Sequence, residues 1–187
     1  TVHELKERGI ENILALRGDI PTNTDFPLPD QYHHAIELIR EIREAGDFCI
    51  GGACYPEGHP EAANMNEDLD HLKEKVDAGC EYLTTQMFFD NEKYYAFVDR
   101  CRAEGITVPI IPGIKPIVFK NQLTVLPKIF RSDIPEPFAT ELRKCKTDDE
   151  AKAVGVEWCI QQCKDLIAHG VPSLHFYTMM ASDSVYK

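Results

Sequence analysis

The sequence predicts an α/β protein, a (β/α)8 TIM barrel of which this chain covers about strands 4 to 8. Three observations lead to this prediction. Strand-like apolar runs alternate with helical sequence along all 187 residues without a long linker, which favours a parallel sheet with helical crossovers. No Gly-x-Gly-x-x-Gly follows any of these runs, so the dinucleotide fingerprint of a doubly wound sheet is absent. Residues suited to chemistry gather at several strand ends, as they do in barrels.

Five segments are predicted as strands because they are short apolar runs bounded by turn-forming residues. They are Asn12–Leu16, Phe48–Cys54, Tyr82–Phe89, Ile106–Ile111 and Ser173–Met179. The chain begins in a helix and ends where another helix would begin. A complete barrel needs roughly 250 residues. We therefore expect residues 1–187 to be a single catalytic barrel domain that is incomplete, without the N-terminal strands and the last helix.

Helical periodicity fills the segments between the strands. The predicted helices are His3–Arg8, Gln31–Glu44, Asn66–Ala78, Glu92–Ala103 and Asp148–His169, and a helical region with proline interruptions runs from Asn121 to about Cys145. The helix over 66–78 carries two stripes at helical spacing. Its apolar stripe is predicted to face the core. Its polar stripe is Asp68, His71 and Lys75, which suits a ribose hydroxyl and phosphates, although a solvated helix face is the simpler explanation of this pattern taken alone.

Composition narrows the class of protein. The net charge of −11 argues against nucleic acid or an anionic membrane as the main partner, and no apolar run reaches the roughly 18 residues of a spanning helix. Seven cysteines without a Cys-x-x-Cys pair suit reduced thiols in a cytoplasmic protein. Cys159 and Cys163 share a helix face, but no second pair of ligands lies near them, so we predict no metal site.

The first strand delivers Arg17-Gly18-Asp19 at its carboxyl end. In a barrel, this edge is where the chemistry lies. Gly18 lets a ligand approach the backbone closely, and a charge of each sign flanks it. A simple strand-end turn is the plain alternative. A cell-adhesion role is disfavoured, because the tripeptide closes a buried strand.

The second strand ends in a loop whose backbone is restricted by Pro56 and Pro60. Tyr55 directly precedes the first proline, and His59 lies between the two. Tyr55 offers an aromatic face and a hydroxyl, and the alternative is a solvated turn. Glu57, His59 and Glu61 have the chemistry of metal ligands but not a metal-binding spacing. We therefore prefer an organic ligand at this loop.

Two later strands each offer one candidate. Gln86 lies near the end of the third strand, and a buried amide must find hydrogen-bond partners, either a heterocycle edge or neighbouring backbone. The fourth strand ends in a rigid turn, Ile110–Pro116. In the fifth strand, Tyr177 can stack on an aromatic ligand or fill the barrel.

Taken together, these residues resemble the methylenetetrahydrofolate reductase family. The order and spacing of the matching motifs agree over nearly the whole chain. The motifs are Leu16-Arg17-Gly18-Asp19, Tyr55-Pro56-Glu57-Gly58-His59-Pro60-Glu61-Ala62, Lys75-Val76-Asp77-Ala78-Gly79, Thr85-Gln86-Met87-Phe88-Phe89-Asp90, Ile110-Ile111-Pro112-Gly113-Ile114 and His175-Phe176-Tyr177-Thr178.

The resemblance implies a barrel that holds FAD at the carboxyl ends of its strands. NADH or NADPH would reduce the flavin and leave. The folate would then take the donor's place, so that 5,10-methylenetetrahydrofolate becomes 5-methyltetrahydrofolate in a ping-pong scheme. The implied setting is the cytoplasm and one-carbon metabolism, with a small-molecule folate substrate and no nucleic-acid or membrane partner. We also expect a homo-oligomer.

The resemblance also assigns residues. Asp19 is the catalytic residue, beside the isoalloxazine and the folate, where its negative charge favours a cationic form of the substrate. The expected flavin-binding residues are Arg17, Gly18, Asp19, Ala35, Tyr55, His59, Ala62, Asp68, His71 and Lys75. The expected folate-binding residues are Asp19, Gln86, Gln122 and Tyr177.

The chain also departs from the family pattern. Many members have Asn-Arg where this chain has Met180-Ala181, and Glu74 replaces a base seen in some members. The family's proton-donating glutamate belongs to a strand that this chain does not include. Two other functions stay open. One is another flavin-dependent barrel oxidoreductase, such as one acting on proline, and the other is a barrel module that has lost catalysis.

Overall fold

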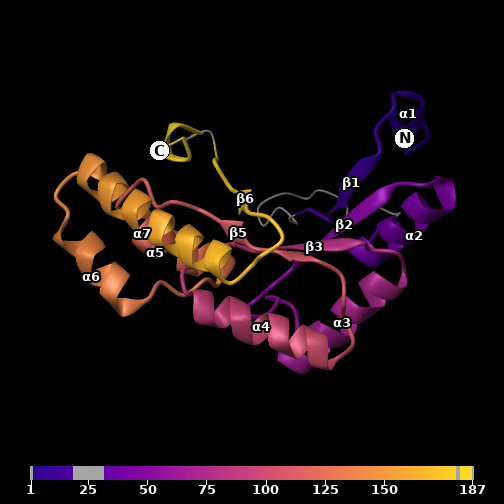
Figure 1. Ribbon diagram of the computed structural model, residues 1–187, viewed down its shortest axis with the longest axis horizontal. Helices are drawn as coiled ribbons and strands as arrows, with labels where there is room; N and C mark the ends of the chain where they lie inside the picture. The colour runs from indigo at the N-terminus through magenta and orange to yellow at the C-terminus, as the bar shows by residue number, and fades with distance from the viewer. Residues whose placement is uncertain (1, 19–31, 180–181, 187) are drawn as a thin grey trace, which may run out of the picture.

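The computed structural model describes residues 2–18, 32–179 and 182–186, and Figure 1 shows how their helices and strands are arranged. The strands are β1 (Asn12–Ala15), β2 (Cys49–Cys54), β3 (Tyr82–Thr85), β4 (Ile110–Ile111), β5 (Gly113–Ile114) and β6 (His175–Phe176). The helices are α1 (Val2–Glu7), α2 (Ala35–Ala45), α3 (Met65–Asp77), α4 (Asn91–Ala103), α5 (Gln122–Phe130), α6 (Glu136–Lys144) and α7 (Asp148–Ala168), followed by a 3-10 turn at Ser182–Ser184.

All strand pairs in the described residues are parallel. β1 to β4 form one sheet in sequence order, and β5 pairs with β6. Only Pro112 separates β4 from β5, and its carbonyl accepts a hydrogen bond from the His175 N–H at 3.0 Å. One extended segment therefore joins the two sheets. The parallel α/β class is confirmed, whereas closure into an eight-stranded barrel and the strand numbering stay predictions.

Helices α3 and α4 lie along one side of the strands, as Figure 1 shows. Leu83, Ile110 and Ile114 pack there against the apolar faces of these helices, and all three side chains are buried. Because side chains alternate along a strand, the intervening residues face the other way. We call this second side the inner face. At the end of the first strand, the side chains of Leu14, in β1, and Leu16, just after it, are exposed.

The helix predicted over 66–78, with one apolar and one polar stripe, is confirmed as α3. Its apolar stripe packs as expected, with Leu69 and Leu72 buried and Val76 against the same cluster. Asn64 caps the helix, and its side chain accepts hydrogen bonds from the N–H groups of Asn66 and Glu67. Such an N-cap satisfies donors that a first helical turn leaves unpaired.

Several predicted boundaries were wrong. β3 ends at Thr85 rather than Phe89, and the carbonyls that follow pair with side chains instead of a strand. The Ser132 hydroxyl donates to Met87 O at 2.7 Å, the Gln162 amide to Phe88 O at 3.0 Å and the Trp158 indole to Phe89 O at 3.1 Å. The fourth strand is only Ile110–Ile111 and the last only His175–Phe176. The interrupted helical region from Asn121 to about Cys145 is confirmed, and it divides into α5 and α6.

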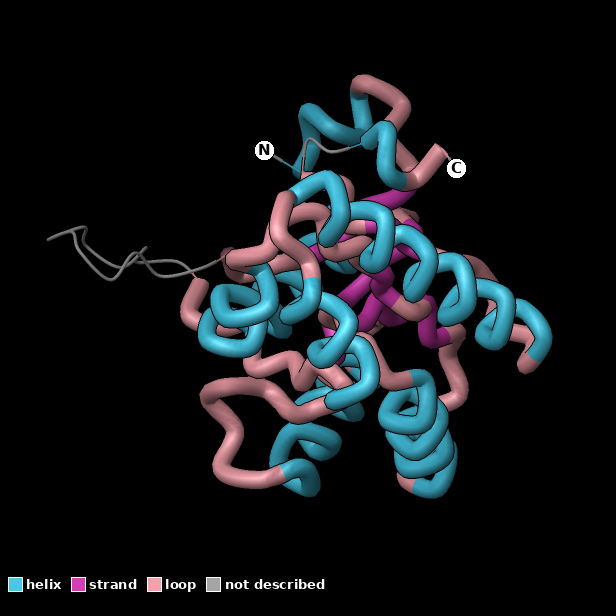
Figure 2. Tube along the Cα trace, turned by 90° about the vertical axis from the view of Figure 1, so that its left-hand side faces the viewer, coloured by secondary structure: helices cyan, strands magenta, loops and turns pink. Residues whose placement is uncertain are grey.

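Figure 2, turned by 90°, shows the strands in the middle of the molecule with helices around them. The structure has no disulfide among the seven cysteines, and burial raises the pKa of Cys80 to about 11, which makes this thiol less reactive. Within the described ranges, no helix combines the length and the apolar character needed to cross a bilayer.

Candidate functional site

The loop after β2 brings together several predicted site residues. The Tyr55 and His59 rings meet edge to face, with centroids 4.5 Å apart. The backbone N–H of His59 donates to Asp68 Oδ2 at 3.0 Å, and the N–H of Glu61 donates to His59 Nδ1 at 3.1 Å. An Nδ1 that accepts a hydrogen bond places the proton of a neutral imidazole on Nε2. His59 can therefore donate a hydrogen bond to a ligand, and burial lowers its pKa, which favours this neutral form.

The polar stripe of α3 divides into buried and exposed parts. Asp68 is 8% exposed, and burial raises its pKa above the usual value. Burial lowers the pKa of Lys75, whose Nζ donates to the Ala53 carbonyl at 2.8 Å. His71 is exposed. The structure thus brings Asp68 and Lys75 to the end of β2 beside His59, while His71 remains at the surface.

The end of β1 is tied to the same loop. The Arg17 guanidinium donates to both carboxylate oxygens of Glu61, at 2.8 and 2.9 Å. Gly18 has φ +81°, and an added Cβ would meet no atom of the described residues within 4 Å. Two other predicted flavin-binding residues lie in different places. Ala62 is in the loop after β2, where its N–H donates to His59 O at 3.1 Å, and Ala35 is the first residue of α2.

The predicted folate-binding residues already have hydrogen bonds within the chain. Gln86 follows β3 rather than lying inside it, and its Oε1 accepts from the Met87 N–H at 2.9 Å. Gln122 Oε1 accepts from the N–H groups of Val118 and Phe119, at 2.8 and 3.1 Å. In neither side chain does the amide NH₂ have an acceptor among the described residues, so both keep donor capacity for a ligand.

Tyr177 joins three strands. Its hydroxyl donates to Thr85 O at 2.8 Å, and its ring lies edge-on to His175 with centroids 4.7 Å apart. Burial raises the pKa of Tyr177 to about 12, so the hydroxyl stays protonated at neutral pH. Thr85 also accepts the Gly113 N–H through its Oγ1, at 2.8 Å. This contact of β3 with β5 and β6 was not predicted.

Two sets of predictions lie outside the described residues. Asp19, the predicted catalytic residue, is one of them, and Met180-Ala181 is the other. Among the residues that are described, no group of three or more histidine, cysteine or acidic side chains is arranged to hold a metal ion.

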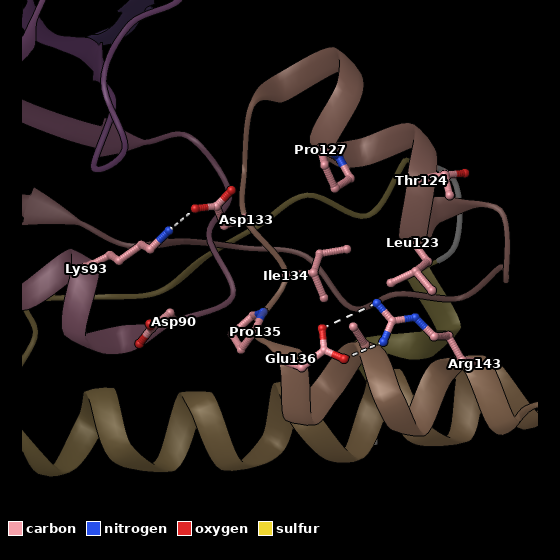
Figure 3. A pocket seen from close by; sticks show the side chains of 11 residues that line it. Asp90, Lys93, Leu123, Thr124, Pro127, Asp133, Ile134, Pro135, Glu136 and Arg143 are labelled. Atoms are coloured by element: carbon pink, nitrogen blue, oxygen red, sulfur yellow. Dashed lines mark hydrogen bonds and ion pairs between the residues drawn. The ribbon is translucent and has the colours of Figure 1, made fainter.

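An ion-pair network next to the site was missed. Glu57 accepts from Lys93 of α4 and from the Asp133 backbone N–H, and Lys93 also pairs with Asp133. Figure 3 shows Lys93 and Asp133 at one side of a hollow of about 530 Å³, with the Glu136–Arg143 pair at the other. The sequence shows an acid, Glu57, between two prolines, but it does not show which residues pair with it.

We expect Asp68→Ala to lower the free energy of unfolding by about 2 kcal/mol, because it leaves the His59 N–H without its acceptor. Asp68→Asn keeps an oxygen there and is the matched control. Since burial raises the folded-state pKa of Asp68 above 3.8, this group's contribution to stability is fully present below that pH and falls as the pH rises through the folded pKa.

Urea unfolding at about pH 4 and about pH 8 measures both effects. The difference in unfolding free energy between Asp68→Asn and the parent protein should shift in favour of the variant at the higher pH. An Asn variant as damaging as the Ala variant, with no pH dependence, would show that the hydrogen bond to His59 does not stabilise the loop.

Comparison with known proteins gives the family. The family model for methylenetetrahydrofolate reductase matches residues 1–187, the whole chain. This chain belongs to the methylenetetrahydrofolate reductase family. The resemblance predicted from the motifs is thereby confirmed.

Curated relatives agree with the family assignment. The chain is 42% identical over 98% of its length to a probable methylenetetrahydrofolate reductase (NADPH) of Caenorhabditis elegans. It is 37% identical over 96% to methylenetetrahydrofolate reductase (NADH) 1 of Arabidopsis thaliana, and 41% identical over 96% to 5,10-methylenetetrahydrofolate reductase of Pectobacterium carotovorum. The chain spans 28% and 33% of the nematode and plant proteins and 59% of the bacterial one.

A solved structure shares the fold of this reductase-family chain. It is an uncharacterized protein from Clostridium thermocellum, described as binding two copies of 5-methyl-5,6,7,8-tetrahydrofolic acid. The TM-score is 0.54 at 17% sequence identity, and the match covers 81% of this chain and 56% of the other. At this identity the likeness supports the fold.

Proposed function

We propose that this chain is part of an enzyme that reduces 5,10-methylenetetrahydrofolate to 5-methyltetrahydrofolate, with FAD as cofactor and NADH or NADPH as electron donor. The match of the family model over the whole chain carries the proposal. The names of the relatives include both NADPH and NADH, so the proposal leaves the donor open between them.

The proposed architecture is a (β/α)8 barrel in which residues 1–187 supply about strands 4 to 8. The parallel strands in sequence order support it, and so does the fold shared with the Clostridium thermocellum protein. In such a barrel, the ends of β1, β2, β3 and β6 meet at one rim. This rim would hold both the cofactor and the folate. The setting that we propose is cytoplasmic and homo-oligomeric.

The described residues fit FAD in two respects. Gly18 has no side chain and no described atom lies within 4 Å of where a Cβ would be, so a flat ring can approach this backbone closely. Tyr55, His59 and the buried Asp68 carboxylate form a set of donors and acceptors suited to a chain of hydroxyl groups. Bound there, FAD would supply the hydride chemistry of the reaction.

The residues have distinct roles in this proposal. Arg17 and Gly18 line the flavin, with Ala35 near it. Tyr55, His59 and Ala62 hold its ribityl and diphosphate region, while Asp68, His71 and Lys75 hold ribose and phosphate. His71 is exposed, whereas Lys75 is half-buried and bonded to Ala53 O. Lys75 therefore acts mainly by its charge, and His71 is the freer of the two to contact phosphate.

Substrate binding involves a second group of side chains. Gln86 and Gln122 offer amide N–H groups to the polar edge of the folate, and Tyr177 lines the pocket that donor and folate occupy in turn. Asp19 lies beside the folate, where a negative charge stabilises a cationic form of the substrate as it accepts hydride. A shared pocket makes the reaction ping-pong, because the donor must leave before the folate binds.

The test is an anaerobic visible spectrum of the full-length protein, before and after NADPH or NADH and then the methylene-folate. We expect a flavin band that the donor bleaches and the folate restores. Asp19→Asn should slow the folate step by about 100-fold. A band that proline bleaches and folate leaves unchanged would favour the other flavin oxidoreductase, and absence of flavin would favour the non-catalytic module.

A further inference from the structure

Lys115 is a buried cation without a partner in the part of the chain that the structure describes. It is 3% exposed. No described residue accepts a hydrogen bond from its ammonium group, and burial lowers its pKa with no nearby charge to oppose that effect. Other partly buried lysines are paired: Lys75 donates to Ala53 O, and Lys93 pairs with Glu57 and Asp133. A buried ammonium that lacks such a partner is costly.

The strand register places Lys115 on the inner face. Ile114 pairs with Phe176, and both pack against the helix-side core. Residues on either side of Ile114 therefore face away from the helices. An added Cβ on Gly113 would indeed point at the Tyr177 ring, 2.6 Å away. Lys115 follows Ile114 as Tyr177 follows Phe176, so Lys115 and Tyr177 share this face.

This position is a carboxyl end of parallel strands, where ligands bind in such sheets. We propose that the Lys115 ammonium binds a negatively charged oxygen of a ligand held on the inner face beside Tyr177. The ligand's identity rests on the proposed function. That function offers two anions, the ring edge of the reduced flavin and the carboxylates of the folate.

The experiment compares full-length protein with its Lys115→Met variant, which keeps the length of the side chain and removes the charge. Lys128→Met, at an exposed lysine of α5, is the matched control. In ligand-free protein, Lys115→Met should raise the melting temperature, because it removes an unpaired buried charge. Lys128→Met should leave it unchanged.

Binding measurements with each ligand distinguish the two candidate anions, the reduced flavin and the folate. If the reduced flavin is the anion, Lys115→Met should weaken binding of reduced relative to oxidised FAD about tenfold, which lowers the two-electron midpoint potential by about 30 mV. If folate is the anion, the variant should bind 5-methyltetrahydrofolate about tenfold more weakly. It should bind an analogue without the glutamate as the parent protein does, and its potential should be unchanged.

The proposal is overturned if Lys115→Met lowers the melting temperature of the ligand-free protein and moves neither ligand measurement. That result would show that the ammonium group has a partner within the chain itself. Failure of the proposed function is separate, since the parent protein would then bind neither flavin nor folate before any substitution is made.

Discussion

Replacing Gly155 with alanine is expected to lower the free energy of unfolding by about 3 kcal/mol. Gly155 lies inside α7, where an added Cβ would come within 1.9 Å of Ile117 O, 2.8 Å of its carbonyl carbon and 3.0 Å of its nitrogen. All three atoms are backbone, so no side chain can rotate away. Alanine gains about 1 kcal/mol in helix propensity, and the clash outweighs it.

The measurement is thermal unfolding, where a loss of this size lowers Tm by roughly 10 °C in a domain of this length. Gly170→Ala is the matched control. Gly170 follows α7 with φ +74° and no described atom within 4 Å of an added Cβ, so its cost is the backbone strain, about 1 kcal/mol. Equal losses at the two positions would show that α7 does not depend on its close approach to Ile117.

Replacing Gly113 with alanine is expected to have the second large effect, about 2 to 3 kcal/mol. An added Cβ would lie 2.2 Å from Thr85 O and 2.6 Å from Tyr177 Cε2. Either β5 moves away from β3, or the Tyr177 ring leaves its position over Gly113. In both cases the hydrogen bond from Tyr177 to Thr85 O is lost. We therefore expect weaker ligand binding together with the lower stability.

Tyr177→Phe separates the two consequences, because it keeps the ring and removes only the hydroxyl. It should cost about 1 kcal/mol, the usual net value of one hydrogen bond. Urea unfolding and flavin fluorescence titration of both variants provide the comparison. If Gly113→Ala behaved like Tyr177→Phe in both measurements, the tight packing of β5 on β3 would not matter.

Local sequence patterns were enough to predict most elements. The helix over 92–103 was predicted to within one residue, since α4 spans Asn91–Ala103 with Asp90 as its cap. The third strand was predicted too long. Met87, Phe88 and Phe89 are buried apolar residues, and an apolar run looks the same in a strand and in a loop packed between helices.

The candidate site was predicted less completely than the fold. Motifs identified Tyr55, His59 and Asp68, which the structure does bring together at the end of β2. The pairing of Glu57 with Lys93 and Asp133 joins positions up to 76 residues apart, and no local pattern encodes it. Lys115 had a visible signal, a lysine within an apolar stretch, but the lack of an acidic partner among the described residues is a property of the fold alone.

The three side chains that hold the loop after β3 have a consequence for how the protein folds. Ser132, Trp158 and Gln162 bind carbonyls that precede them by 45, 69 and 74 residues. During synthesis, β1 to β3 can pair before α7 has been made, since their paired residues are only 31 and 37 positions apart. The loop that carries Gln86 cannot be secured until α7 has been made. The rim of the sheet should therefore become ordered late, and contacts of such long sequence separation are slow to form.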